Sequence, residues 1–155
     1  MGRKTPKAKR RSRHAKRDPK TTPTVVSGQQ ETPLFCFHYA DRRTGGTYAF
    51  SYTDPHATVI LDFICEMSKL TWAEIGAQST GTRNGHRKHH PMPITVLDDA
   101  PQRDLQRAQL DETFGDEMFR FRLGSKRRLW GFRRGRTFHV VWWDDQHEVY
   151  PTDPD

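Results

Sequence analysis

Residues able to bind a phosphate and to move a proton gather near the end of the chain. Between residues 120 and 136 the sequence carries eight Lys or Arg and no acidic residue, and His147 and Tyr150 follow soon afterwards. Arginine binds phosphate through a planar fork that donates two hydrogen bonds. Histidine gives or takes a proton near neutral pH. The stretch therefore predicts a surface that binds a nucleic-acid backbone, and it leaves open whether chemistry accompanies the binding.

Alternating residues place these cations on a three-stranded meander. In segment 119–123, "FRFRL", the apolar residues point one way while Arg120 and Arg122 point the other. A second strand surrounds Gly131, where the missing side chain permits a close approach of neighbouring backbone. The third strand is 137–143, "TFHVVWW". Cations on the polar side of such a sheet would form one charged face.

The third strand has apolar residues at both odd-numbered and even-numbered positions, and therefore on both of its faces. Strict alternation puts Phe138, Val140 and Trp142 on one face and Val141 and Trp143 on the other. A strand that is buried on both faces belongs inside a sheet or under helices. We therefore expect this strand to have neighbours on both sides.

The remaining elements predict an α+β fold. Two aromatic-rich runs in 34–52, joined by a turn at 41–46, indicate a β-hairpin. Helical spacing follows from Pro55, and "TWAE" (71–74) is a capping box that starts a second helix. Residues 79–93 read as a loop, and another helix begins near Asp99. We expect a single domain over 33–155, in which a small antiparallel sheet (the hairpin plus the meander) packs with two or three helices.

The first 32 residues have a different composition and read as a disordered basic arm and linker. Residues 1–20 hold ten Lys or Arg and one acidic residue, whereas residues 21–155 hold 16 basic and 18 acidic residues. The positive charge of the chain is thus concentrated in the arm. Such an arm binds polyanions by releasing counterions, or it serves as a solubilising or targeting tail.

Several functional classes are disfavoured by the sequence. No run approaches the ~20 apolar residues of a membrane span, and no apolar segment of a signal peptide follows the basic arm. We expect a cytoplasmic protein in which Cys36 and Cys65 are buried free thiols, with a single disulfide as the alternative. His86, His89 and His90 lack the paired short spacings of zinc sites, so no metal or cofactor is expected.

The C-terminal segments "FRFRLGSKRRLWGF" and "FHVVWWDDQHEVY" resemble the C-terminal half of RelE/YoeB-type toxins, small ribosome-dependent mRNA endonucleases. Those proteins pack two helices against a twisted antiparallel sheet, and the helices expected over 55–78 follow the same order. The 34–52 hairpin, the arm and residues 79–118 lie outside the resemblance. The layout "LTWAEI", "FHVVWWD" and "HEVYP" also resembles that of actinobacterial and phage proteins with no established activity.

The toxin resemblance implies roles for individual residues. It gives Arg128 a phosphate-binding role with Arg122 in support, and it puts His147 and Tyr150 in the terminal His/Tyr position. Attack by a 2′-hydroxyl requires removal of its proton, stabilisation of the phosphoryl oxygens and protonation of the leaving oxygen. The general base would be Glu112 or Glu117, and the sequence does not choose between them. The carboxylates around His147 would either raise its pKa or repel RNA; they are Asp144, Asp145 and Glu148.

Three functions of different class follow from these residues. The first is an RNA-binding endoribonuclease of toxin type that needs no metal. The second is a non-catalytic RNA or ribosome binder, and the third is a module that binds an acidic, antitoxin-like protein. The candidate nucleic-acid contacts are Arg120, Arg122, Lys126, Arg127, Arg133, Arg134 and Arg136, with Arg10 and Arg11 from the arm.

Overall fold

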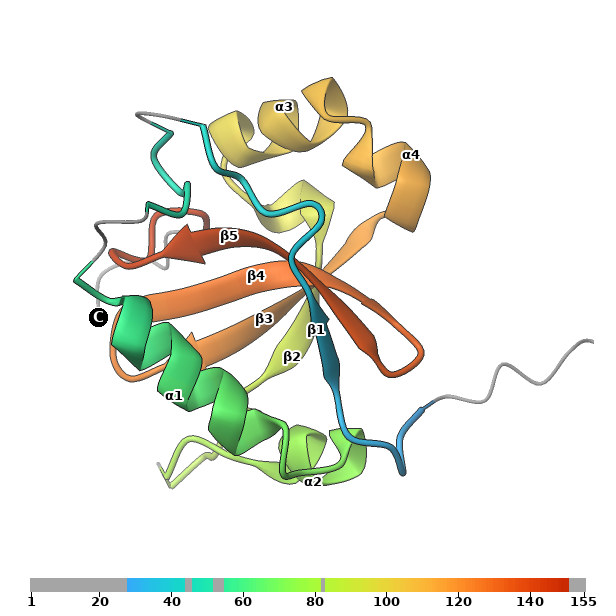
Figure 1. Ribbon diagram of the computed structural model, residues 1–155, viewed down its shortest axis with the longest axis vertical. Helices are drawn as coiled ribbons and strands as arrows, with labels where there is room; N and C mark the ends of the chain where they lie inside the picture. Colours follow the sequence, from blue (N-terminus) through green and yellow to red (C-terminus); the bar gives the residue numbers. More distant parts are fainter. Residues whose placement is uncertain (1–27, 44–45, 52–54, 82, 151–155) are drawn as a thin grey trace, which may run out of the picture.

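The computed structural model describes residues 28–43, 46–51, 55–81 and 83–150. These residues form an α+β fold built on a five-stranded mixed sheet, as Figure 1 shows, so the predicted fold class is confirmed. The strands are β1 (Leu34–Cys36), β2 (His90–Pro93), β3 (Glu117–Leu123), β4 (Arg127–Arg134) and β5 (Thr137–Asp144). The helices are α1 (Ala57–Met67), α2 (Trp72–Ala77), α3 (Asp99–Arg107) and α4 (Leu110–Phe114), with a 3-10 turn at Ile94–Val96.

The sheet has the strand order β1-β5-β4-β3-β2. Strands β3, β4 and β5 form the predicted antiparallel meander, and β5 has a neighbour on each side, as its two-sided apolar pattern indicates. The prediction of a hairpin over 34–52 is wrong. Strand β1 pairs in parallel with β5, Leu34 opposite Thr137. In its described part, residues 46–51, the second aromatic run forms no strand, and the carbonyl of Tyr48 instead accepts a hydrogen bond from the Trp143 amide.

The fold includes residues that precede the expected domain start at residue 33. Residues 28–32, assigned to the linker, already contact the rest of the fold. The Glu31 carbonyl accepts a hydrogen bond from the amide of Trp72, and the Gln29 carbonyl accepts one from Ala73. The arm itself, including Arg10 and Arg11, lies outside the described residues.

The helix starts follow local chemistry where the chain is described. The Thr71 hydroxyl accepts a hydrogen bond from the Glu74 amide, and the Glu74 carboxylate accepts one from the Thr71 amide, which completes the predicted capping box. Helix α1 begins at Ala57, two residues after the Pro55 start that the sequence indicates, and its N-cap His56 makes no side-chain cap hydrogen bond. Asp54, which could cap a helix starting at Pro55, lies outside the described residues. Both cysteines are free, as predicted, but Cys65 is exposed rather than buried because it lies on the solvent face of α1.

Two elements escaped the sequence analysis. Helix α4 is a short helix after α3, and β2 lies within the segment that was read as a loop. Strand β2 pairs antiparallel with β3 at the edge of the sheet. Its sequence, "HPMP", contains Pro91 and Pro93, which cannot donate to a ladder and are therefore found in edge strands.

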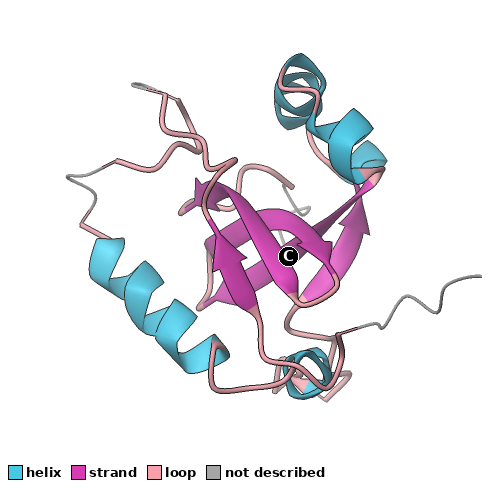
Figure 2. Ribbon diagram, turned by 45° about the vertical axis from the view of Figure 1, so that its right-hand side comes forward, coloured by secondary structure: helices cyan, strands magenta, loops and turns pink. Residues whose placement is uncertain are grey.

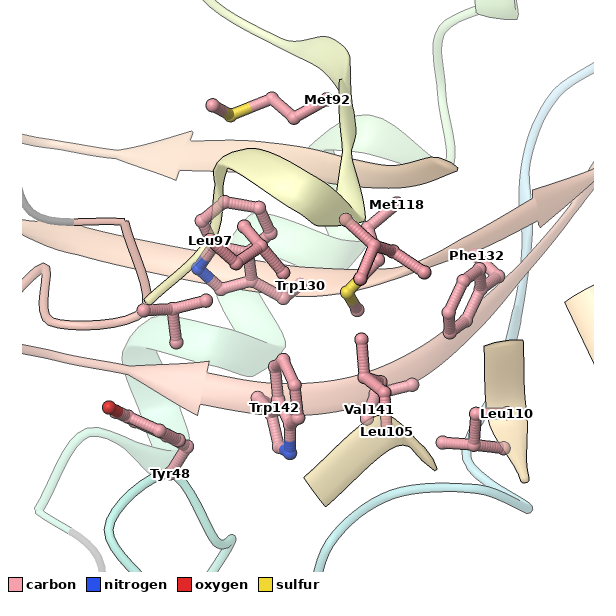
Figure 3. Packing of buried hydrophobic residues seen from close by; sticks show 12 residues of the cluster. Tyr48, Met92, Leu97, Leu105, Leu110, Met118, Trp130, Phe132, Val141 and Trp142 are labelled. Carbon is pink, nitrogen blue, oxygen red and sulfur yellow. The ribbon is translucent and has the colours of Figure 1, made fainter. Parts of the chain in front are cut away.

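The sheet separates two apolar clusters. Helices α1 and α2 cover one face and α3 and α4 the other, as Figures 1 and 2 show from two directions. The first cluster includes Phe121 and Phe138 packed on Trp72. The second includes Trp130 and Trp142, seen in Figure 3. Side chains on one strand therefore belong to different cores according to their parity.

A β-bulge in β5 changes this parity. Trp130 pairs with Trp142 whereas Gly131 pairs with Val140, so Val141 is an extra residue in β5. The predicted grouping of Trp142 with Phe138 and Val140 is therefore wrong: Trp142 lies in the α3/α4 core together with Val141. Gly131 permits this arrangement, because a Cβ atom at that position would lie 2.1 Å from the His139 carbonyl oxygen.

Candidate anion-binding site

The strand register places three arginines on one face of the sheet, close to the β3–β4 turn. Arg122 pairs with Arg128 across β3 and β4, and Arg120 is two residues before Arg122 on the same face. We call Arg120, Arg122 and Arg128 the arginine cluster. It lies on the side of the sheet that carries the Trp130 core, so the predicted convergence of these arginines on a single face is observed.

The hydrogen-bond partners of the cluster are uncharged. Arg128 Nη1 and Nη2 donate to the carbonyl oxygens of Arg127 at 2.8 Å and Ser125 at 2.9 Å. Arg122 Nε donates to the Gly124 carbonyl at 3.0 Å. The Nε atoms of Arg120 and Arg128 are buried without a partner. Among the described residues, no carboxylate forms an ion pair with any of the three arginines.

This arrangement makes the cluster electrostatically strained. Burial, with the charges of Arg120 and Arg122, lowers the pKa of Arg128 to about 10. The side chain of Arg128 is only 3% exposed, so water screens its charge poorly. Burial and the charge of Arg122 lower the pKa of Arg120 as well. The charge of Asp144 offsets part of this repulsion, and an anion bound here would relieve the remainder.

Strand β2 adds a histidine that the sequence analysis did not assign to the site. His90 pairs with Arg120 across β2 and β3, and Arg120 Nη2 donates to His90 Nε2 at 2.9 Å. The other ring nitrogen, Nδ1, lies 3.0 Å from the Pro91 carbonyl oxygen and therefore carries the proton. Burial is the main cause that lowers the pKa of His90. A neutral, oriented imidazole thus adjoins the cluster.

The neighbouring His89 has a structural role instead. Its Nδ1 accepts a hydrogen bond from the Arg122 amide at 3.0 Å, and its Nε2 lies 3.2 Å from Gln78 Oε1. The ring packs against Phe63 and Phe121 in the α1/α2 core. Burial, with the charge of Lys88 as the next cause, lowers its pKa to about 3. His89 is a core histidine whose hydrogen bonds are satisfied.

Asp144 shapes the loop that brings His147 to the cluster. Its carboxylate accepts hydrogen bonds from the amides of Glu148 at 2.9 Å and Val149 at 3.1 Å, and from Trp130 Nε1 at 3.4 Å. The loop bends at His147, whose φ of 64° is in the left-handed region. Although Asp144 pairs with Arg128 in the sheet, its oxygens bind N–H groups of the loop, so it supports the site without forming an ion pair.

His147 faces the arginine charges. Burial is the largest cause that lowers its pKa, followed by the charges of Arg128 and Arg120. Asp144 acts to raise this pKa, as one of the two alternatives held, but it is outweighed and the net pKa is lowered. His147 Nε2 is buried without a hydrogen-bond partner. Tyr150 is half-buried against the α3/α4 core and lies close enough to influence the pKa of Arg120.

The other predicted contacts are distributed over the fold. Lys126 ends the β3–β4 turn beside the cluster, and Arg127 begins β4. Three arginines lie at the opposite end of β4 and β5. There Arg133 lies over the Trp72 ring at 4.2 Å, Arg134 lies over Phe114 at 4.7 Å, and Arg136 forms an ion pair with Glu31.

The two candidate general bases lie away from the cluster. Glu117 begins β3 at the end opposite to Arg122 and pairs with Pro93. Glu112 is exposed on α4. His90 and His147, rather than a glutamate, are the proton-carrying groups beside the cluster.

These features define an α+β protein with a mixed five-stranded sheet and a cationic site at the β3–β4 turn. Comparisons with models of protein families, with curated proteins and with solved structures find no match. Within the described ranges, no helix is long and apolar enough to cross a membrane. The same residues hold no group of three or more His, Cys, Asp or Glu arranged to bind a metal ion.

Proposed function

We propose that the protein binds RNA and holds a backbone phosphate at the arginine cluster. The observation that carries this proposal is a set of three guanidinium groups on one face whose hydrogen-bond partners are all uncharged. A phosphate diester supplies the missing negative charge and accepts the N–H groups of arginine. Arg120 and Arg122 are half-exposed and would contact the phosphate, while Arg128 beneath them contributes fixed charge.

The histidines favour RNA over an acidic protein partner. His90 and His147 adjoin the arginines, and burial and positive charge keep the rings neutral by lowering their pKa. Both ring nitrogens of His90 are already bonded, to Arg120 and to the Pro91 carbonyl, whereas His147 Nε2 has no partner. A neutral imidazole with such a nitrogen can exchange a hydrogen bond with a 2′-hydroxyl, the group that distinguishes RNA from DNA. The ionised carboxylates of an acidic protein have no proton to donate to a neutral imidazole.

Cleavage of the bound RNA is the second candidate function, and one atom favours it. His147 Nε2 is buried beside the cluster without a hydrogen-bond partner. If the loop at His147 moves so that this nitrogen reaches the bound RNA, a neutral imidazole can take the proton of a 2′-hydroxyl while the arginines stabilise charge on the phosphoryl oxygens. The same imidazole, once protonated, can return a proton to the leaving 5′-oxygen. The resemblance to RelE/YoeB-type toxins suggests the same chemistry.

Binding is tested by fluorescence anisotropy with labelled single-stranded RNA at several salt concentrations. The variant Arg120→Ala/Arg122→Ala should bind about tenfold more weakly or worse, because it loses charge-assisted hydrogen bonds. The slope of log K against log salt should fall by about 0.7 for each phosphate contact that is lost. Arg83→Ala/Arg103→Ala is the matched control, because it removes two exposed cations away from the cluster.

The same titration can reject the proposal. Equal affinities and equal salt slopes for the cluster variant and wild type would show that RNA does not use this face. Tight binding of an acidic protein that Arg120→Ala/Arg122→Ala abolishes, without RNA binding, would favour the protein-interaction function instead.

A further inference from the structure

A cavity of about 390 Å³ lies at the same end of the sheet as the arginine cluster. Its walls come from three parts of the chain: the β3–β4 turn, the loop after β5, and the residue before α1. The lining side chains that could contact a ligand are His56, Leu123, Lys126, Arg127, Asp145 and Gln146. Cavities of this size hold one small ligand or one unit of a longer ligand.

The cavity and the arginine cluster share the β3–β4 turn. Ser125 lines the cavity, and its carbonyl oxygen accepts the hydrogen bond from Arg128 Nη2. Gln146 lines the cavity, and it is followed in the chain by His147, whose ring faces the arginine cluster. A polymer that places one phosphate at the cluster and passes over this turn therefore reaches the cavity next.

The polar groups of the cavity suit a nucleotide. Lys126 and Arg127 on the turn provide positive charge for a phosphate, and Leu123 provides an apolar surface for a base. Gln146 Nε2 donates to Asp145 Oδ2 at 3.2 Å. This hydrogen bond orients the two side chains, and His56 Nδ1 lies 3.9 Å from the same oxygen, Asp145 Oδ2. Asp145 Oδ1 and Gln146 Oε1 have no donor in the described part of the chain.

Two neighbouring acceptors select for donors on the ligand. Adenine, cytosine and guanine carry exocyclic amino groups, each of which can donate one proton to each of two acceptors, whereas the Watson–Crick edge of uracil offers only its single N3–H between two carbonyl oxygens. Proteins read single-stranded RNA by hydrogen bonds to exposed base edges. Asp145 and Gln146 would thus discriminate against uracil.

We propose that this cavity is a base-binding subsite for single-stranded RNA and that it prefers a base with an exocyclic amino group. The proposal rests on the proposed function, because the arginine cluster supplies the neighbouring phosphate contact. Asp145 accepts the amino protons, while Lys126 and Arg127 hold the flanking phosphate.

The test measures the affinity of the full chain for labelled rC, rA and rU homopolymers of equal length. Wild type should bind rC and rA about tenfold more tightly than rU. Asp145→Asn replaces an acceptor with an amide and should bring the rC/rU ratio close to one. The ratio is the readout because the lost negative charge raises the affinity for all three RNAs alike.

Asp62→Asn provides the matched control. It removes the same charge from an exposed position on α1 and should leave the rC/rU ratio at its wild-type value. Equal wild-type affinities for rC, rA and rU would overturn the base-binding subsite, and so would an unchanged ratio in Asp145→Asn. Failure of the proposed function looks different: none of the homopolymers would bind, or Arg120→Ala/Arg122→Ala would bind them as wild type does.

Discussion

The two ends of the β3–β5 meander carry similar numbers of arginines in opposite situations. At the far end, Arg133 and Arg134 lie over aromatic rings and Arg136 pairs with Glu31. At the β3–β4 turn, Arg122 and Arg128 face each other with carbonyl oxygens as partners. The first set is satisfied within the fold, whereas the second retains unused charge. Arginine content alone thus does not identify a binding site; the partners of each guanidinium do.

The largest expected difference between the two ends is chemical, because only the turn end places His147 against the cluster. His147→Ala should slow RNA cleavage about 100-fold or more, since a general acid or base contributes at least that factor. Exposed His86, changed to Ala, is the control. The measurement is cleavage of a labelled RNA by purified protein with a chelator present.

The pH dependence of cleavage checks the same assignment. If His147 removes the 2′-proton, the rate should fall as the pH drops through a pKa below the ordinary 6.5, because the protonated ring cannot accept a proton. A wild-type rate for His147→Ala would exclude histidine catalysis and leave a binding site.

Acid should destabilise the protein through His89, which accepts a hydrogen bond from the Arg122 amide near the turn end of the meander. The folded-state pKa of His89 is about 3 against an ordinary 6.5. Between these two values the His89 ring binds a proton in the unfolded chain but stays neutral in the folded protein. The contribution of the neutral His89 ring to the free energy of unfolding is therefore fully present above pH 6.5 and is lost as the pH falls from there toward 3. Between about pH 7 and about pH 5 the contribution of His89 to the free energy of unfolding should fall by about 2 kcal/mol.

Urea unfolding at the two pH values measures this loss. His89→Gln should remove most of the 2 kcal/mol difference, about the size expected for one buried neutral histidine, although its absolute stability is lower. His86→Gln should keep the wild-type difference. If His89→Gln loses as much stability in acid as wild type, the acid response comes from other groups.

The smallest expected effect concerns stability near neutral pH. Arg133→Ala should lower the free energy of unfolding by about 1 kcal/mol, because it removes a cation from the face of Trp72. Arg122→Ala loses one hydrogen bond but relieves repulsion with Arg128, so its stability should stay near or above the wild-type value. Urea titrations of both variants compare the ends directly; equal losses would abolish the distinction drawn between them.

Local patterns in the sequence predicted much of this fold. Alternation identified the meander and the shared face of Arg120 and Arg122, and the Thr71–Glu74 spacing identified the start of α2. Each of these features depends on residues a few positions apart, where periodicity and capping act. Alternation grouped only Arg120 with Arg122; Arg128 was added by what the toxin resemblance implies, and its place opposite Arg122 comes from the pairing of β3 with β4.

Features that depend on distant pairing were not predicted. The parallel pairing of β1 with β5 joins Leu34 to Thr137, and nothing local in the aromatic run distinguishes it from a hairpin. Strand β2 was hidden by its prolines, although "HPMP" is compatible with an edge strand. Its recognition would have brought His90 to the site. The satisfied far-end arginines were likewise invisible, because their partners lie on other elements.

The extra residue in β5 has a consequence for how the chain tolerates changes in length. Because Val141 is accommodated as a bulge, Asp144 turns inward to hold the His147 loop while Asp145 turns toward the cavity. Deleting the extra residue itself would leave Trp142 opposite Trp130 and Asp144 opposite Arg128, so both aspartates would keep their places. Deleting Trp143 instead would bring Asp145 opposite Arg128 and turn Asp144 to the other face of the sheet, which would disconnect both halves of the proposed RNA site even though every functional side chain would still be encoded. Length changes between the bulge and Asp144 should therefore be as damaging as the loss of the arginines themselves, whereas loss of the bulge residue should leave the register of the site in place.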